Sequence, residues 1–172
     1  VVACGLGPVY EPATLRTMTW PGRIGFTLAR RLPAAVPVVY NNLLAAVLRR
    51  RPQLLLGLLL RGAPASDRAV LADPGVRGTF TTAAAEALRQ GGVGVWADFR
   101  RYVRPWGGML ADIRCPVSLW HGEADQVVAP AHMERLAAGI AGASLRRVPG
   151  AGHYALPVRH QREILADALA VG

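Results

Sequence analysis

A short apolar run near the C-terminal end of the chain, residues 115–121, is followed by one amphipathic segment. A second short strand is predicted after it, over residues 144–148. Between them, Met133, Leu136 and Ile140 recur at the three- to four-residue spacing of one helix face. The order predicts strand, helix, strand. Two strands joined through a helix are expected to lie parallel, so that their carboxyl ends meet at one edge of a sheet.

A polar loop follows each of these predicted strands. Gly-Glu-Ala-Asp ends at Asp125, and Pro-Gly-Ala-Gly-His ends at His153, where the glycines allow a sharp turn. Ligand sites in open α/β sheets form at the carboxyl edge of the strands. A carboxylate there can hold one imidazole nitrogen and stabilise the charge when the other nitrogen takes a proton. The pattern predicts an orienting acid, Asp125, and a general base, His153; Glu123 is the nearest competitor for the acid.

The rest of the chain has a mostly helical pattern. Apolar residues 1–4 end at Gly-Leu-Gly-Pro, which predicts the end of an early strand. Residues 11–21 are expected to be irregular. Helices are predicted over residues 24–32, 36–50, 52–61, 66–72, 79–90, 96–103 and 158–170, the last with Ile164, Leu165 and Leu169 toward the sheet. Three strands are few for a doubly wound sheet, so we expect an incomplete one.

The motifs HGEAD and PGAGH, with a crossover helix between them, resemble the C-terminal half of an α/β-hydrolase. The resemblance is specific over about residues 111–170. In that superfamily the chain order is nucleophile, acid, histidine, which implies Asp125 as the acid and His153 as the histidine. The implied fold class is α/β: an incomplete α/β-hydrolase fold with the last three parallel strands and an inserted, mostly helical cap.

The same resemblance divides the chain into three parts. Residues 1–8 would end a core strand, residues 9–107 would form the helical cap or lid, and residues 108–172 would form the C-terminal part of the core that carries acid and histidine. The cap would form one wall of a largely hydrophobic pocket. Val127 and Tyr154 flank the acid and the histidine and are candidate pocket residues, although a packing role fits either of them equally well.

The family's nucleophile elbow, Gly-x-Ser-x-Gly or a variant with Cys or Asp, is missing. The chain has three serines, which are Ser66, Ser118 and Ser144. The last two fall in predicted strands, and Ser66 is a predicted helix N-cap. Cys4 lacks the flanking glycines that an elbow requires. We therefore expect the nucleophile to lie upstream, outside this chain, and expect this fragment to show no turnover by itself.

The activity implied by the resemblance is hydrolysis of an ester or a related bond through a covalent intermediate, with a small apolar or amphipathic substrate. Two alternatives remain open, because a fold does not fix a function. One is a non-catalytic remnant or a module that binds a small ligand or a partner. The other is an acyltransferase, a cofactor-free haloperoxidase or a carbon–carbon hydrolase on the same scaffold. The oligomeric state is open.

The net charge of +9 changes little in this interpretation. All twenty basic residues are arginines, they are scattered along the sequence, and no nucleic-acid motif accompanies them, so we expect no nucleic-acid partner. His121 and Glu123 add metal-ligand types near Asp125 and His153, but the Pro-Cys-x-x-Cys partner of a zinc deaminase is missing. We expect no metal and no cofactor.

The remaining cysteines and histidines are expected to be structural or solvated. Cys4 and Cys115 are predicted to be buried, reduced thiols. His121 is predicted to hydrogen-bond near the acid loop, whereas His132 and His160 are predicted to face solvent. The longest apolar run, residues 54–60, is far shorter than the roughly 20 residues that cross a bilayer, so we expect a cytoplasmic protein with no membrane partner.

Overall fold

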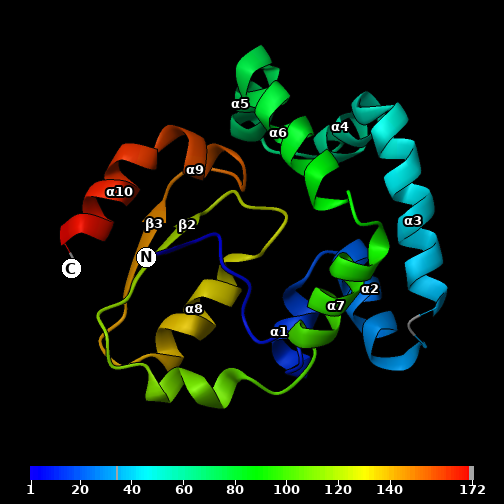
Figure 1. The fold of residues 1–172 in the computed structure, drawn as a ribbon. Helices are drawn as coiled ribbons and strands as arrows, with labels where there is room; N and C mark the ends of the chain where they lie inside the picture. The colour runs from blue at the N-terminus through cyan, green and yellow to red at the C-terminus, as the bar shows by residue number, and fades with distance from the viewer. Residues whose placement is uncertain (34, 171–172) are drawn as a thin grey trace.

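The computed structural model describes residues 1–33 and 35–170 and contains one three-stranded parallel sheet. Its strands are β1 (Val2–Ala3), β2 (Ser118–Gly122) and β3 (Ser144–Val148), in the order β1-β2-β3 (Figure 1). Leu119 lies opposite Val2 on one side and Leu145 on the other. The prediction of adjacent parallel strands with their carboxyl ends at one edge is confirmed.

The strand β2 begins later than the sequence pattern suggested. Ser118 pairs with Ser144, which is the first residue of β3. Residues 115–117 therefore precede the paired part of the sheet. Cys115 is exposed there, so the prediction that it is a buried thiol was wrong.

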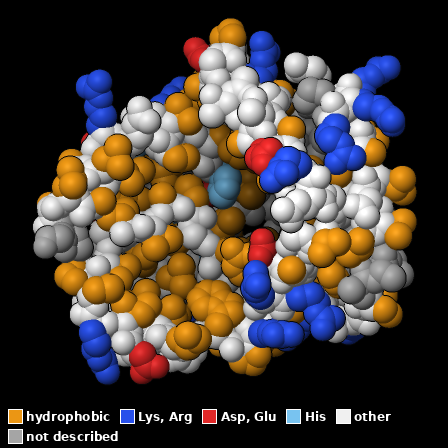
Figure 2. All heavy atoms as spheres, in the orientation of Figure 1, with side chains coloured by type: hydrophobic (Ala, Val, Ile, Leu, Met, Phe, Trp, Pro, Cys, Tyr) orange, Lys and Arg blue, Asp and Glu red, His pale blue; other side chains and the backbone are white. Residues whose placement is uncertain are grey.

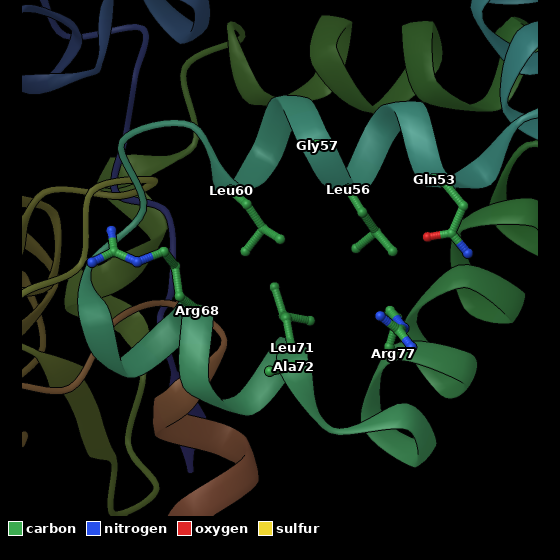
Figure 3. A pocket seen from close by; sticks show the side chains of 8 residues that line it. All are labelled: Gln53, Leu56, Gly57, Leu60, Arg68, Leu71, Ala72 and Arg77. Carbon is green, nitrogen blue, oxygen red and sulfur yellow. The ribbon is translucent and has the colours of Figure 1, made fainter.

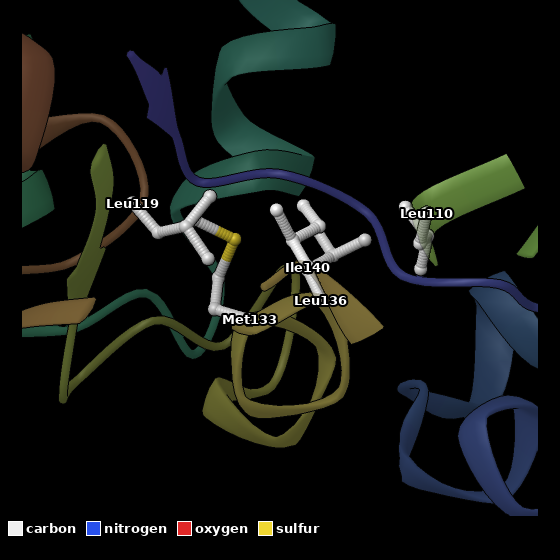
Figure 4. Close-up of a cluster of buried hydrophobic side chains, with 5 residues drawn as sticks. All are labelled: Leu110, Leu119, Met133, Leu136 and Ile140. Carbon is white, nitrogen blue, oxygen red and sulfur yellow. The ribbon is translucent and has the colours of Figure 1, made fainter. Parts of the chain in front are cut away.

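One face of the sheet is covered by α8 (Pro130–Gly139). Side chains alternate between the two faces of a strand, and Leu119 points to this face, where it is fully buried. It packs in one cluster with Leu110, Met133, Leu136 and Ile140 (Figure 4). The predicted helix face thus supplies this half of the core. Burying each such side chain contributes about 1.5–3 kcal/mol.

The opposite face is covered by α9 (Ala155–Arg159) and α10 (Gln161–Ala170). Trp120 points this way and packs with Leu156 and Ile164. Its indole Nε1 donates to Asp167 Oδ2 at 2.7 Å. The Ser118 hydroxyl donates to the same carboxylate oxygen, so α10 is attached to the sheet by polar contacts as well as apolar ones.

The final segment differs from the single helix that was predicted over residues 158–170. It forms two helices, α9 and α10, with a break at His160. Leu165 and Leu169 are 62% and 84% exposed, so their predicted contact with the sheet was wrong. The physical reason is helical register: Ile164 and Asp167 lie three residues apart and occupy the inner side of α10, which turns Leu165 and Leu169 outward.

Between β1 and β2 the chain forms consecutive helices, drawn from blue to green in Figure 1. They are α1 (Pro12–Thr17), α2 (Trp20–Arg31), α3 (Ala35–Arg50), α4 (Pro52–Leu60), α5 (Ala65–Ala72), α6 (Pro74–Ala87), α7 (Gly92–Tyr102) and the 3₁₀ helix η1 (Gly107–Asp112). We call α1–α7 the helical segment. Among the described residues, every helix is too short or too polar to span a bilayer.

Proline and aspartate explain two errors at helix starts. Residues 11–21 were predicted to be irregular, yet α1 and α2 each carry a proline in the first turn, where the missing N–H costs no hydrogen bond. Asp73 ends α5, in agreement with the predicted helix limit at residue 72, and its side chain also accepts the Val76 N–H at 2.9 Å. It is therefore the N-cap of α6, which begins at Pro74 instead of residue 79.

Gly122 brings the loops after β2 and β3 together, and we expect Gly122→Ala to destabilise the fold. A Cβ at this position would lie 2.2 Å from the Ala151 carbonyl oxygen, so backbone must shift. The same carbonyl accepts the Ala124 N–H at 3.0 Å. The expected loss in the free energy of unfolding is about 3 kcal/mol, at the upper end for overpacking, measured by urea denaturation.

The control for that substitution is Gly94→Ala, because a Cβ there meets open space on an exposed turn of α7. It is expected to stabilise the chain by up to about 1 kcal/mol through helix propensity. Equal stability of the two variants would show that the contact between Gly122 and Ala151 does not limit the fold.

Candidate active site

Asp125 lies in the tight loop that follows β2. Its Oδ1 accepts the N–H groups of Val127 and Val128, both at 2.8 Å. Its own N–H donates to the Gly122 carbonyl at 3.1 Å. The residue is 5% exposed. These contacts fix the orientation of the carboxylate through Oδ1, while Oδ2 lies 3.8 Å from His121 Nε2.

His153 lies in the loop after β3 and meets the second oxygen of that carboxylate, Oδ2. Its Nδ1 is 2.9 Å from Asp125 Oδ2, although the two residues are 28 positions apart. A carboxylate can only accept, so this contact assigns the proton of the neutral imidazole to Nδ1 and leaves Nε2 without one. The structure therefore brings together the two residues that the sequence singled out, in the tautomer that a general base requires.

Electrostatics keeps Asp125 ionised in this position. Burial by itself disfavours the charged form, but the hydrogen bond and charge of His153, with the N–H groups of Val128 and Val127, outweigh it. The pKa of Asp125 is consequently lowered below its usual value. An ionised carboxylate is the form that can hold Nδ1–H and stabilise an imidazolium.

Two further histidines lie buried beside this pair. His121 Nε2 is 3.0 Å from the Val128 carbonyl, as expected for a structural hydrogen bond near the acid loop. His132 Nδ1 accepts the Gly7 N–H at 3.2 Å. Both side chains are almost completely buried, so the prediction that His132 faces solvent was wrong. The first turn of α8 packs under the chain that leaves β1, where a Cβ on Gly7 would lie 3.0 Å from the His132 carbonyl oxygen.

Burial lowers the pKa of both His121 and His132, which makes stability depend on pH. As pH falls through the ordinary histidine value of 6.5, the unfolded chain takes up protons that the folded chain binds less readily. The free energy of unfolding should therefore be constant above that pH and decrease below it. Urea denaturation between pH 8 and 5 measures how steeply the free energy of unfolding changes with pH. His132→Asn is expected to reduce this slope, because its amide oxygen still accepts the Gly7 N–H while the asparagine side chain does not titrate.

The control for this measurement is His160→Asn, which removes a partly exposed histidine at the junction of α9 and α10. It makes the same change of side chain at a site away from the two buried histidines. If His132→Asn has the wild-type slope, His132 does not contribute to the pH dependence.

Cys4 follows β1 and lies at the same edge of the sheet. Its φ is +51°, which is uncommon outside glycine. Its thiol donates to the His153 carbonyl oxygen at 3.6 Å. Burial, followed by the nearby charge of Asp125, raises the pKa of Cys4 to about 12. The group is a protonated thiol at neutral pH, so its nucleophilicity is low.

Ligand atoms of Cys4, His121 and Asp125 lie within 4.8 Å of one another. These residue types suit a transition metal. Both oxygens of Asp125 already accept hydrogen bonds, one of them from His153. A metal bound at Oδ2 would therefore compete directly with His153.

The opposite nitrogen of His153 is available for chemistry. Among the described residues Nε2 has no hydrogen-bond partner, and the side chain is 24% exposed. Figure 2 shows histidine atoms beside a hollow whose rim carries hydrophobic side chains and also acidic and basic ones. An imidazole held at Nδ1 and open at Nε2 can take a proton from a group placed next to Nε2.

The two candidate pocket residues lie beside the pair, and their role stays a prediction. Val127 is 38% exposed and contributes its N–H to Asp125. The Tyr154 ring makes edge-to-face contacts with Phe80 and His153, each with 5.2 Å between centroids. Burial raises the pKa of Tyr154, so the phenol is protonated at neutral pH.

A cavity of about 390 Å³ lies elsewhere, between α4, α5 and the start of α6 (Figure 3). It is lined by Gln53, Leu56, Gly57, Leu60, Arg68, Leu71, Ala72 and Arg77. Neither Val127 nor Tyr154 lines it, and neither member of the Asp125–His153 pair does. It is formed by the helical segment alone and is separate from the candidate active site.

Sequence reasoning missed two residues of α5 that contact the histidine loop. The Ser66 hydroxyl accepts the Gly152 N–H at 3.0 Å, and Asp67 Oδ1 accepts the Tyr154 N–H at the same distance. Ser66 was predicted to be a helix N-cap, which was wrong: Pro64 occupies that position. An acidic residue in the first turn of a helix is ordinary, so nothing in the sequence marked Asp67.

No protein-family model and no curated protein matches the sequence. Similar solved structures include a hydrolase from Pseudomonas aeruginosa PA01, which is 24% identical with a TM-score of 0.52 over 86% of this chain and 60% of that one. A bromoperoxidase from Bacillus anthracis is 16% identical, also with a TM-score of 0.52, over 82% of this chain and 49% of that one. This chain thus spans three fifths or less of either protein. Its parallel sheet, the covering helices and these likenesses show an incomplete α/β-hydrolase fold.

Proposed function

We propose that the chain is the C-terminal part of an α/β-hydrolase that cleaves an ester or a related bond, with His153 as general base and Asp125 as its orienting acid. The observation that carries the proposal is the 2.9 Å contact between His153 Nδ1 and Asp125 Oδ2. An open Nε2 and an ionised, buried carboxylate complete the arrangement. In this proposal the helical segment is the cap over the site.

The nucleophile is assigned to residues that precede Val1 in a longer protein. Among the described residues, β1 pairs with β2 along one edge, and its other edge is open to a further strand. In the part of the chain that the structure describes, no hydrogen bond joins any of the three serines to His153. Ser66 accepts the Gly152 N–H, Ser118 donates to Asp167, and Ser144 begins β3 beside Ser118.

The chemistry that follows has two steps. A Ser or Cys nucleophile attacks the carbonyl carbon while His153 Nε2 takes its proton and then returns it to the leaving group. His153 next takes a proton from water, which attacks the covalent intermediate. With an Asp nucleophile, His153 would act in the second step alone. Asp125 stabilises the imidazolium in each case.

Turnover of p-nitrophenyl butyrate by two forms of the protein tests the proposal. The 172-residue chain is expected to give no turnover that depends on His153, whereas the protein extended upstream of Val1 is expected to hydrolyse the ester. Cys4→Ala in the extended form should retain activity, because its thiol is protonated and already bonded to a backbone carbonyl.

Three results would contradict the proposal. Robust His153-dependent hydrolysis by the 172-residue chain would place the nucleophile within it. Loss of activity in Cys4→Ala would assign that role to Cys4. Failure of the extended protein to hydrolyse this ester and longer or shorter acyl esters would favour the non-catalytic interpretation.

A further inference from the structure

The loop that carries His153 is held by side chains of α5. Three backbone N–H groups around the histidine donate to that helix. The bonds run from Gly152 to Ser66 Oγ at 3.0 Å, and from Tyr154 and Ala155 to Asp67 Oδ1 at 3.0 and 2.8 Å. They connect the residue before His153 and the two residues after it to positions more than 80 residues earlier in the chain.

The approach of Asp67 explains why residue 152 is a glycine. A Cβ on Gly152 would lie 2.4 Å from the carboxylate carbon and both oxygens of Asp67. Its backbone does not need the left-handed region; in this loop Gly150 adopts it, with φ of +67°. The two glycines before His153 therefore serve different purposes, since Gly150 makes the turn and Gly152 gives Asp67 room.

Apolar contacts support the same attachment. Val70 and Leu71 of α5 are buried in one cluster with Ala155, the first residue of α9. The Tyr154 ring packs edge-to-face on Phe80 of α6, with 5.2 Å between centroids. The histidine loop is consequently fixed to the helical segment on one side, while Asp125 holds the imidazole on the other.

Asp67 is 1% exposed, and this makes its two hydrogen bonds important for the local structure. Buried N–H groups that lose their acceptor carry the full cost of desolvation. If the acceptor were removed, the N–H groups of Tyr154 and Ala155 would have to find water, and the loop would shift. A shift of about 1 Å at a reacting group can lower a rate by about 10²-fold.

We propose that Ser66 and Asp67 are positioning residues for His153, an inference that builds on the function proposed above. They fix the backbone on both sides of the histidine, so that Nδ1 meets Asp125 and Nε2 stays open. In this proposal the helical segment holds the general base, His153, in position and also covers the site. Neither residue touches the reacting atoms.

Four variants separate this role from general destabilisation. Asp67→Ala and Ser66→Ala remove the acceptors, whereas Asp67→Asn retains an oxygen at Oδ1 and removes the charge. Asp73→Ala is the matched control, because it removes an aspartate that caps α6 through the Val76 N–H, away from the histidine loop. Two quantities are measured: the ¹H signal of His153 Nδ1–H in the 172-residue chain, and kcat and KM for p-nitrophenyl butyrate in the extended protein.

The Nδ1–H signal is expected to broaden or disappear in Asp67→Ala and Ser66→Ala, and to persist in Asp67→Asn and Asp73→Ala. In the extended protein kcat should fall about 10²-fold in Asp67→Ala with little change in KM, and Asp67→Asn should recover most of it. If Asp67→Ala does not fold, the test rests on the Nδ1–H signals and the kcat values of Ser66→Ala and Asp67→Asn. A wild-type signal in Ser66→Ala, or equal losses in Asp67→Ala and Asp73→Ala, would overturn the inference.

The two readouts keep this inference distinct from the proposed function. The Nδ1–H signal reports the geometry of the loop whether or not any ester is hydrolysed. An extended protein that hydrolyses no ester, combined with the expected loss of signal in Ser66→Ala, would refute the hydrolase proposal and retain the role of Ser66 and Asp67 in holding His153.

Discussion

His153→Ala is expected to lower kcat of the extended protein by at least about 10³-fold, with KM nearly unchanged. The substitution removes the only group in the described site that is held by Asp125 and open to a substrate at its other nitrogen. Proton transfer from the nucleophile and from water would then depend on solvent. Because proton transfer belongs to the chemical step, the loss should appear in kcat.

Steady-state ester hydrolysis by wild type, His153→Ala and His160→Ala gives the comparison. His160 lies between α9 and α10, where it approaches Glu163 at 3.5 Å, and its replacement should preserve kcat within a few fold. A His153→Ala variant with more than a tenth of wild-type kcat would refute the assignment of His153 as the base.

Asp125→Asn is expected to reduce kcat/KM by about 10³–10⁴-fold, as a change of tautomer does in other Asp–His pairs. The loop N–H groups of Val127 and Val128 both point at Oδ1, so the amide oxygen must occupy that side. The amide NH₂ then faces His153 and donates to Nδ1. The ring proton moves to Nε2, and the nitrogen that should accept a proton already carries one.

The control is Glu123→Gln, which changes an exposed acid two residues earlier and leaves the loop bonds intact. It should have wild-type kcat/KM. Thermal unfolding of Asp125→Asn checks that the loop still folds, since its two backbone N–H groups keep an acceptor. A fully active Asp125→Asn variant would mean that Asp125 has a structural role alone.

The parts of the fold that could be predicted are those set by short-range pattern. The limits of β3 were predicted correctly, as was the apolar face of α8, because strand alternation and helical spacing both appear within a dozen residues. The contact between Asp125 and His153 was predicted as well, because two parallel strands joined by a helix carry both loops to the carboxyl edge of the sheet. One rule of topology was enough for that contact.

The errors concern contacts between segments that are distant in sequence. His132 was assigned to solvent because charged residues flank it, but the chain leaving β1 covers it and donates a backbone N–H. Leu165 and Leu169 were turned inward because the polar anchor Asp167 was not recognised.

The bonds from α5 to the histidine loop likewise cross more than 80 positions. No local pattern in the sequence encodes such partners. Asp67 became visible as a contributor to the site once the fold had placed its carboxylate against Gly152.

The state of the His153 ring tests the central claim most directly. Long-range ¹H–¹⁵N spectra of the 172-residue chain with labelled histidine distinguish a protonated from a bare ring nitrogen. In the neutral imidazole, Nδ1 is expected to carry the proton, with a strongly downfield signal that disappears in Asp125→Asn, and Nε2 is expected to be bare. A proton on Nε2, or a freely averaging ring, would contradict an Asp125–His153 pair.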